Sequence, residues 1–211
     1  MTSILKVDTI QDADGNNIIN ESGNTITIGA SGDTISIPSG ATIANSGTAT
    51  GFGIDGITVA DQWRLPANQS VTTSASVLTG WERPDDQESG LDCYGRIGTG
   101  MSESSGTFTF PSTGIYLVRI VARSSTASQS AVYIQIRMSK DGSNYDSIGD
   151  GTHYIENGFT GYTLSEYFAD VTNTSNDLIQ FTGRSSAGTN TVNGSTNENI
   201  TSVTFIRLGD T

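Results

Sequence analysis

The stretch GTFTFPSTGIYLVRIVA, residues 106 to 122, indicates the fold class of this chain. Two apolar runs flank a short polar turn, in which Pro111 and Gly114 set the bend. The run after the bend is almost continuously apolar, as expected for a strand that is buried in a sheet. The residues that we expect to feed this buried strand pair are Ile115, Tyr116, Leu117, Ile120 and Val121.

Similar β runs continue from Trp63 to the end of the sequence. They include SVTTSASVLTGWE, GLDCYGRIG, SAVYIQIRMSK, TGYTLSEYFADV, DLIQFTGR and NITSVTFIRL. Turn signals separate them at residues 84–86, 141–142, 150–151 and 173–175. Eight or more short strands without a helical crossover indicate an antiparallel sandwich of about 150 residues. Since no segment of ten or more residues has apolar positions at helical spacing, we predict a nearly all-β chain.

The charge of the chain argues against two classes of partner. Its 211 residues contain 10 Lys and Arg against 22 Asp and Glu, a net charge of −12. A chain this acidic repels phosphate backbones, so we expect no binding to nucleic acid. It also lacks the basic amphipathic surface that binds an anionic membrane. The length predicts one ordinary domain with an appendage.

Cysteine content and the first residues bear on the compartment. Cys93 is the only cysteine, so neither an intrachain disulfide nor a paired-thiolate metal site is expected. The opening MTSILKVDTIQDADG has no basic segment followed by an apolar run, and no later stretch approaches 18 apolar residues. We therefore expect a protein that is made in a cytoplasm, stays soluble and does not insert into membranes.

The sequence before these strands contains a short repeat. A glycine-isoleucine phrase occurs four times between residues 15 and 44, as GNNII, GNTITI, GDTISI and GATIA. When the four phrases are aligned, the isoleucines that share one position are Ile18, Ile26, Ile35 and Ile43, at spacings of 8, 9 and 8 residues. Ile28 and Ile37 follow two residues after members of this row and project to the same face of a strand. A short fixed period is typical of stacked units.

One chain cannot fold this repeat alone. Burial of an isoleucine contributes about 1.5–3 kcal/mol, whereas ordering each backbone residue costs roughly 1–2 kcal/mol. Several identical chains around one axis could bury the isoleucine rows against each other. We therefore predict an intertwined stalk, most simply trimeric, with a disordered leader as the alternative.

Three segments of the C-terminal part resemble the C1q/TNF-like jelly-roll family. The segment from Phe108 to Tyr116 resembles the Gly-x-Phe-x-x-Pro-x-x-Gly-x-Tyr signature of that family. SVTFIRLGDT is similar to its closing strand, and DLIQF is similar to its penultimate strand. The resemblance covers residues 80 to 208 in outline and implies a jelly-roll knob.

The whole layout also resembles tail-fibre or head-fibre proteins of marine tailed bacteriophages. Those proteins open with a segment like SILKVDTI (residues 3–10), continue with Ile/Thr/Gly repeats, and end in a C1q-like knob with phrases like WRL and FIRLGDT. The resemblance implies a homotrimeric virion appendage, made in the host cytoplasm, with its N-terminus on another virion protein and its knob outward. The β-repeat stalk differs from the collagen or coiled-coil stalks of animal C1q-like proteins.

The sequence predicts no enzyme and no catalytic residues. His153 in GDGTHY is the only histidine, is expected in a solvated loop, and is accompanied by no Gly-x-Ser-x-Gly motif. Residues 12–16 lack the spacing and the bidentate Glu of a calcium loop. We expect no cofactor and assign no metal ligands. One candidate Ca²⁺ site, with a solvated acidic loop as its alternative, comprises Glu82, Asp85, Asp86 and Glu88.

Recognition is instead expected from aromatic side chains among turn residues. The stretch SNYDSIGDGTHYIENGFTGY contains the receptor-binding candidates Tyr145, His153, Tyr154 and Phe159. Flat aromatic side chains can stack on sugars or insert into a protein groove. The alternative is that half of these residues belong to the core.

These observations predict an all-β chain in four parts. A virion attachment segment (1–20) would act through Ile4, Leu5, Val7 and Ile10. A β-repeat stalk (15–50) and a connector (51–62) would then lead to a C1q/TNF-like jelly-roll knob (63–211). The leading function is host adhesion by a trimeric tail fibre that binds a cell-surface glycan or protein. The alternative is a capsid decoration or cement protein, or a head fibre.

Overall fold

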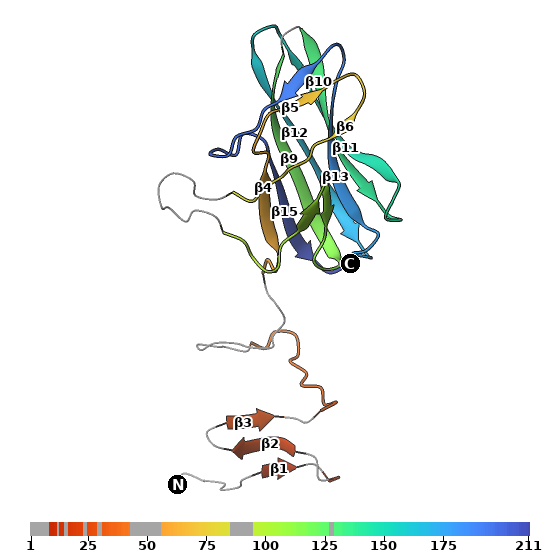
Figure 1. Cartoon of the computed structure of the whole chain (residues 1–211). Helices are drawn as coiled ribbons and strands as arrows, with labels where there is room; N and C mark the ends of the chain where they lie inside the picture. Colours follow the sequence, from red (N-terminus) through yellow and green to blue (C-terminus); the bar gives the residue numbers. More distant parts are fainter. Residues whose placement is uncertain are drawn as a thin grey trace. The chain divides into compact units, whose positions relative to one another are not determined.

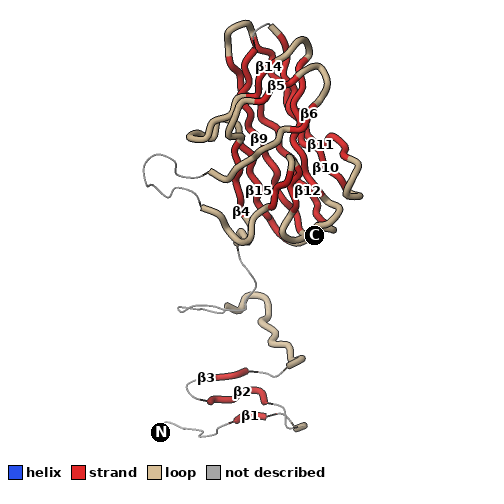
Figure 2. Tube along the Cα trace, viewed as in Figure 1, coloured by secondary structure: helices blue, strands red, loops and turns tan. Residues whose placement is uncertain are grey.

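The computed structural model describes residues 9–11, 13–14, 17–22, 25–28, 31–42, 56–84, 95–126 and 129–211. All regular secondary structure in these residues is β, as the sequence predicts (Figures 1 and 2). The chain divides into two compact units, Met1–Gly51 and Phe52–Thr211. Among the described residues, no helix has the length and apolar character needed to cross a membrane.

The N-terminal unit contains a three-stranded antiparallel sheet. Its strands are β1 (Thr9–Gln11), β2 (Asn17–Ser22) and β3 (Thr25–Ile28), in that order. The register pairs Ile10 with Ile19 and Ile19 with Ile28. These three isoleucines therefore form a cross-strand row within one chain.

This row differs from the predicted register of the repeat, because Ile26 pairs with Glu21. In an antiparallel pair the residue numbers of partners add to a constant, so at most one pair of equivalent residues of two consecutive repeats can lie opposite each other. The residues around Ile35 and Ile37, expected as a strand, have no regular structure because no described strand pairs with them.

The described stalk isoleucines are exposed in the single chain. Their exposed fractions are 67% for Ile26, 53% for Ile28, 59% for Ile35 and 47% for Ile37. The side chain of Ile18 and all of Ile43 lie outside the described residues. The burial of these rows by other copies stays a prediction.

The C-terminal unit, which we call the knob, is a sandwich of two antiparallel sheets. Its strands are β4 (Ala60–Arg64), β5 (Gln69–Val71), β6 (Ser76–Val77), β7 (Ser102–Ser104), β8 (Thr107–Thr109), β9 (Gly114–Thr126), β10 (Ser130–Ser139), β11 (Tyr145–Ile155), β12 (Thr160–Val171), β13 (Leu178–Ser185), β14 (Asn190–Val192) and β15 (Ser202–Gly209).

The two sheets have different orders. The β10 sheet runs β11-β10-β13-β8-β7, with β6 also paired to β13. The β9 sheet runs β4-β15-β9-β14-β5, with β12 along the other side of β9. The connection from β11 to β12 therefore crosses from one sheet to the other (Figure 1).

The stretch from Gly106 to Ala122 forms β8, a turn and most of β9. Gly114 has a φ of +139°, and a Cβ there would lie 2.5 Å from the Arg207 side chain, so this position requires glycine. The hydroxyl of Tyr116 donates to the carbonyl of Ser112 at 3.0 Å and thereby fastens the turn. The predicted bend is confirmed.

Burial along β9 alternates more strictly than the sequence prediction. Tyr116 and Ile120 are fully buried, as expected. Ile115, Leu117 and Val121 belong to the opposite parity and point outward, where each is half-buried. Both faces of β9 are apolar, and the sequence did not separate them.

An aromatic cluster fills the interior near the start of β9. Phe108 lies at its centre, with ring centroids 5.6 Å from Trp63, 5.6 Å from Phe181 and 5.1 Å from Phe205. Burial of such rings contributes about 1.5–3 kcal/mol each. This cluster provides the core that the length of the knob led us to expect.

The interior near the opposite end of β9 is polar. Asn190 is 1% exposed, and its side-chain amide donates to the hydroxyls of Ser130 at 2.6 Å and Ser185 at 2.9 Å. Ser124 and Thr163 are also buried there. Buried polar side chains thus lie among smaller apolar ones at this end, which we call the tip.

Candidate functional site

The β11–β12 connection at the tip is a tight turn built from the sequence ENGF. The backbone N–H of Phe159 donates to the carbonyl of Glu156 at 3.1 Å. Gly158 has a φ of +81°, a conformation that glycine adopts at little cost. The turn leaves Phe159 65% exposed.

His153 belongs to β11 and not to a loop, so its predicted solvated-loop position is wrong. The Asp150–Gly151 dipeptide, expected as a turn, lies inside the same strand. The imidazole of His153 lies against Gly161 of β12, where a Cβ would fall 1.9 Å from its Nε2. The missing side chain of Gly161 therefore makes room for the ring.

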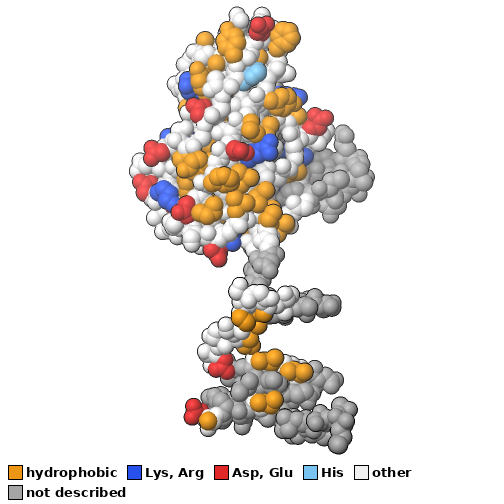
Figure 3. Space-filling view, turned by 180° about the vertical axis from the view of Figure 1, so that it is seen from behind, with side chains coloured by type: hydrophobic (Ala, Val, Ile, Leu, Met, Phe, Trp, Pro, Cys, Tyr) orange, Lys and Arg blue, Asp and Glu red, His pale blue; other side chains and the backbone are white. Residues whose placement is uncertain are grey.

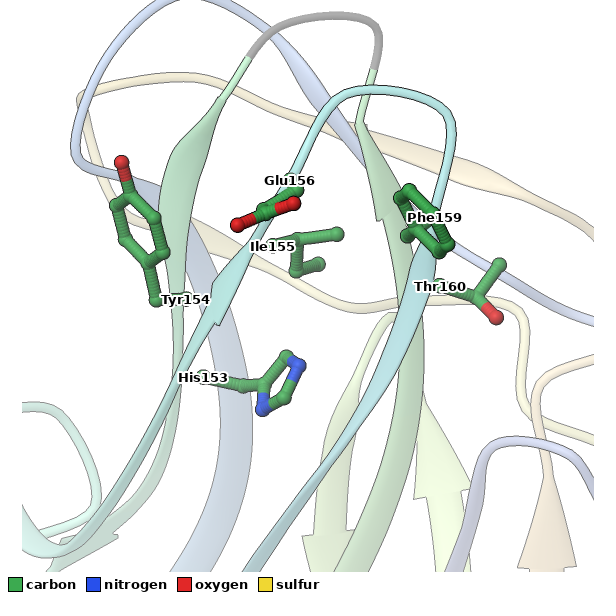
Figure 4. A pocket seen from close by; sticks show the side chains of 6 residues that line it. All are labelled: His153, Tyr154, Ile155, Glu156, Phe159 and Thr160. Atoms are coloured by element: carbon green, nitrogen blue, oxygen red, sulfur yellow. The ribbon is translucent and has the colours of Figure 1, made fainter.

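A shallow pocket of about 230 Å³ lies between the ends of β11 and β12 (Figure 4). Its lining residues are His153, Tyr154, Ile155, Glu156, Phe159 and Thr160. Ile155 is buried and forms the apolar base. Tyr154 is 58% exposed and Phe159 is 65% exposed. We call this site the tip pocket.

The structure brings together three of the four receptor-binding candidates. His153, Tyr154 and Phe159 line the tip pocket, whereas Tyr145 begins β11 at its other end. Nine residues of strand separate Tyr145 from Tyr154, a distance of about 30 Å at the usual rise. Tyr145 therefore cannot share a small ligand with the other three.

Sequence reasoning missed two polar residues of the pocket. Glu156 and Thr160 flank the turn, and both are exposed. The Asn-Gly dipeptide at residues 157–158 between two β runs could have located the turn, and with it these neighbours.

A second candidate surface is the outer side of the β9 sheet. One cross-strand row joins Ile206, Leu117 and Phe168, and another joins Val121 and Leu164. Phe168 is 65% exposed and Leu164 is 50% exposed. We call these two rows the apolar face.

A charged row separates the two apolar rows. It pairs Arg119 with Glu166 in the register of β9 and β12, and both residues are exposed. A shallow depression of about 320 Å³ adjoins this row and is lined by Leu117, Glu166, Tyr167 and Phe168. A space-filling view likewise shows hydrophobic side chains gathered around a few charged ones on one side of the knob (Figure 3).

The outer side of the β10 sheet has a different chemistry. Arg184 stacks on Tyr133 with its guanidinium carbon 3.6 Å from the ring centroid. The side chain of Gln180 donates to Thr107 at 2.9 Å, and that of Gln135 donates to Asp150 at 3.4 Å. In these three pairs, polar and charged groups of this side are satisfied within the chain.

Two aspartates near the end of β10 have perturbed acidity. Burial tends to raise the pKa of Asp177, but hydrogen bonds from Lys140 and from the N–H groups of Asn173 and Thr172 outweigh it and lower the pKa. Hydrogen bonds from Asn144 and Ser143 hold the pKa of Asp141 below its ordinary value. Both carboxylates stabilise loops through these hydrogen bonds, and neither residue lines the tip pocket.

The part of the chain that the structure describes contains no cluster of three His, Cys, Asp or Glu residues suited to a metal ion. In the candidate Ca²⁺ site, Glu82 instead pairs with Arg64 at 2.8 Å. Asp85, Asp86 and Glu88 lie outside the described residues, as does Cys93.

Comparison with solved structures shows that the fold of the knob is similar to the jelly roll of TNF-like proteins. Murine APRIL matches with a TM-score of 0.52 and 12% identity, over 71% of this chain and 98% of that chain. Eiger TNF from S. frugiperda matches with a TM-score of 0.51 and 10% identity, over 72% of this chain and 94% of that chain. The two-sheet architecture agrees with these matches, and the predicted fold of the knob is confirmed.

These likenesses establish the fold alone. The vertex protein P5 of PRD1 is a weaker match, with a TM-score of 0.43 and 12% identity over 73% of this chain and 99% of that chain. The two matches with TM-scores above 0.5, murine APRIL and Eiger TNF, are TNF-like proteins rather than enzymes. No protein-family model matches the sequence, and a comparison with curated proteins finds no match.

Proposed function

We propose that this protein is a homotrimeric fibre of a phage virion and that its knob adheres to the surface of the host cell. The observation that carries the proposal is the contrast between the two outer sides of the sandwich. One presents the apolar face, with Phe168 65% exposed, and the other presents mainly polar groups, several of which are paired within the chain. Exposed apolar rows beside a charged row are typical of a protein interface.

Other copies of the same chain are the simplest partner for this face. Burial of each large apolar side chain would contribute about 1.5–3 kcal/mol. The N-terminal sheet also exposes apolar residues, among them Ile26 and Ile28. A small sheet with no covering layer is marginally stable at best. A homotrimer would cover both regions with identical surfaces, and trimers are the assembly implied by the family resemblance.

The charged row is compatible with such an assembly. Arg119 and Glu166 lie side by side on each copy, so a symmetric arrangement can bring opposite charges of neighbouring copies together. Complementary charges of this kind fix the register of an interface more than they add affinity. The apolar rows on either side would supply most of the binding energy.

The position of the tip pocket supports the adhesive role. The first strand of the knob begins at Ala60, and the register places Ala60 beside Ile206 and Ile206 beside Leu117. The tip lies eight residues further along β9, where Thr160 pairs with Ser125, about 26 Å away. The tip therefore lies at the end of the knob opposite to the start of its first strand, where a binding partner could reach it. Three tips per fibre would strengthen weak contacts through effective concentration.

Two measurements test the proposal. Light scattering of the full-length chain should give three times the chain mass, and a monomer would contradict the trimer. Fluorescently labelled trimer should bind susceptible host cells, and absence of binding to every susceptible host would contradict adhesion. Binding to empty capsids without binding to cells would support the decoration alternative.

Attachment through residues 1–20 remains part of the proposal. Ile4, Leu5 and Val7 lie outside the described residues, and Ile10 is 38% exposed. Deletion of residues 1–8, which precede β1, should leave cell binding intact and abolish incorporation into virions. Immunogold labelling of intact particles would distinguish a tail fibre from a head fibre.

A further inference from the structure

The polar groups of the tip pocket are not engaged by the fold. No described residue forms a hydrogen bond with the side chain of His153, Glu156 or Thr160. In Figure 4 the imidazole of His153 lies between the two strands, with Glu156 and Phe159 beyond it toward the turn. These groups can therefore bind an external molecule without breaking an internal contact.

The arrangement of donors and acceptors matches hydroxyl groups. The carboxylate of Glu156 accepts hydrogen bonds, and the two ring nitrogens of His153 can donate and accept. A ligand that is rich in hydroxyls also donates and accepts at each position. The exposed ring of Phe159 offers a flat apolar surface for the C–H groups of such a ligand.

The charge of the site disfavours an anionic ligand. Glu156 is the one charged residue among the six that line the pocket, and neither Lys nor Arg is among them. The whole chain carries a net charge of −12. An acidic polysaccharide would be repelled by the pocket and by the long-range field of the protein.

The geometry also differs from a site for a cation. Cations bind aromatic residues best when they lie over a ring face within about 6 Å and are desolvated. Tyr154 and Phe159 do not face one another in Figure 4, and the pocket is shallow and open. At about 230 Å³ it is also smaller than the roughly 300–1,000 Å³ of sites for drug-sized ligands.

We infer that the tip pocket binds one neutral sugar ring of a cell-surface glycan. This inference rests on the proposed adhesive function and specifies its ligand. Phe159 stacks on the ring, whereas Glu156 and His153 contact its hydroxyl groups. Gly161 takes part indirectly, since only glycine leaves space for the imidazole of His153.

The test uses the full-length chain and immobilised polysaccharides. Dextran, mannan and galactan are the neutral probes, and alginate and hyaluronan are the acidic probes. We expect binding to at least one neutral probe and none to the acidic ones. Phe159→Ala and Glu156→Gln should each weaken that binding about tenfold. Ile97→Ala, which removes an exposed apolar side chain near Ala60, is the matched control and should leave binding unchanged.

Each contrary outcome has a distinct meaning. Binding to acidic probes alone, or neutral binding that survives both pocket variants, would overturn the inference. Binding to host cells that is lost with Phe159→Ala while every polysaccharide stays unbound would indicate a protein receptor, which overturns the sugar site and leaves adhesion standing. Binding to a neutral probe without binding to host cells would leave the sugar site standing and contradict the proposed function.

Discussion

Replacement of Asp61 by Asn should destabilise the knob strongly. Asp61 is 2% exposed. Its Oδ2 accepts hydrogen bonds from the Met101 N–H at 2.7 Å, from Arg83 at 3.0 Å and from the indole N–H of Trp63 at 3.1 Å. Its Oδ1 accepts a second bond from Arg83 at 3.2 Å. One buried carboxylate therefore links β4 to two other segments of the chain.

The size of the effect follows from these contacts. Asparagine removes the negative charge and turns one acceptor into an N–H₂ group that faces donors. A hydrogen bond to a charged group contributes about 1.5–3 kcal/mol, and an unsatisfied buried donor costs about 1–3 kcal/mol. We expect a loss of about 3 kcal/mol in the free energy of unfolding, out of roughly 5–15 kcal/mol for a domain. The melting temperature should fall by roughly 6–12 °C.

Urea unfolding followed by tryptophan fluorescence is the appropriate assay. Trp63 and Trp81 are both buried in the knob and report on its core. Measurements at several protein concentrations separate unfolding from subunit dissociation. Asp210→Asn is the matched control, because Asp210 also pairs with an arginine but is 93% exposed in that pair. Equal unfolding midpoints for Asp61→Asn and Asp210→Asn would refute the reasoning.

Three further predictions concern assembly, the tip and acid. Phe168→Glu should dissociate the trimer, measured by light scattering, because it places a charge on the apolar face; an unchanged mass would contradict the proposed interface. Gly161→Ala should displace the imidazole of His153, visible as a shift of its NMR signals, and unshifted signals would count against the close approach. Asp177→Asn should lower the free energy of unfolding. This loss should be constant above about pH 5 and should shrink as the pH falls through and below the ordinary carboxyl range, because the pKa of Asp177 is lowered in the folded state. If the stability difference between wild type and Asp177→Asn instead grew on acidification, the expected sign would be wrong. The hydrogen bond from Lys140 to this carboxylate would then not explain the stability.

The strands were largely predictable because strand formation depends on local pattern. The run from Ile115 onward is apolar enough to specify a buried strand, and the turn at Pro111 and Gly114 has its own local chemistry. The prediction failed at residues 150–151, where an Asp-Gly pair sits inside β11. There Gly151 is retained because a Cβ would lie 2.6 Å from the carbonyl oxygen of Leu164 on β12. A contact between distant segments leaves no local signal in the sequence.

The candidate site was predictable in its residue types and not in its geometry. The aromatic and histidine content of residues 143–162 pointed to recognition, and three of the four named residues line the pocket at the tip. Tyr145 was grouped with them because it lies nearby in the sequence. An extended strand, however, rises about 3.3 Å per residue, so nine residues place Tyr145 far from Tyr154. Glu156 and Thr160 both line the pocket because the turn between them reverses the direction of the chain.

The sequence alone was sufficient for the all-β class and for the β-rich C-terminal part of the chain, because alternation and turn residues are properties of neighbouring residues. The tertiary structure was needed to separate the two apolar sides of β9. Tyr116 enters the core and Leu117 faces outward, since the second sheet covers one side of the strand and leaves the other open. Which side a sheet covers depends on packing between segments far apart in the chain, and no local pattern records it.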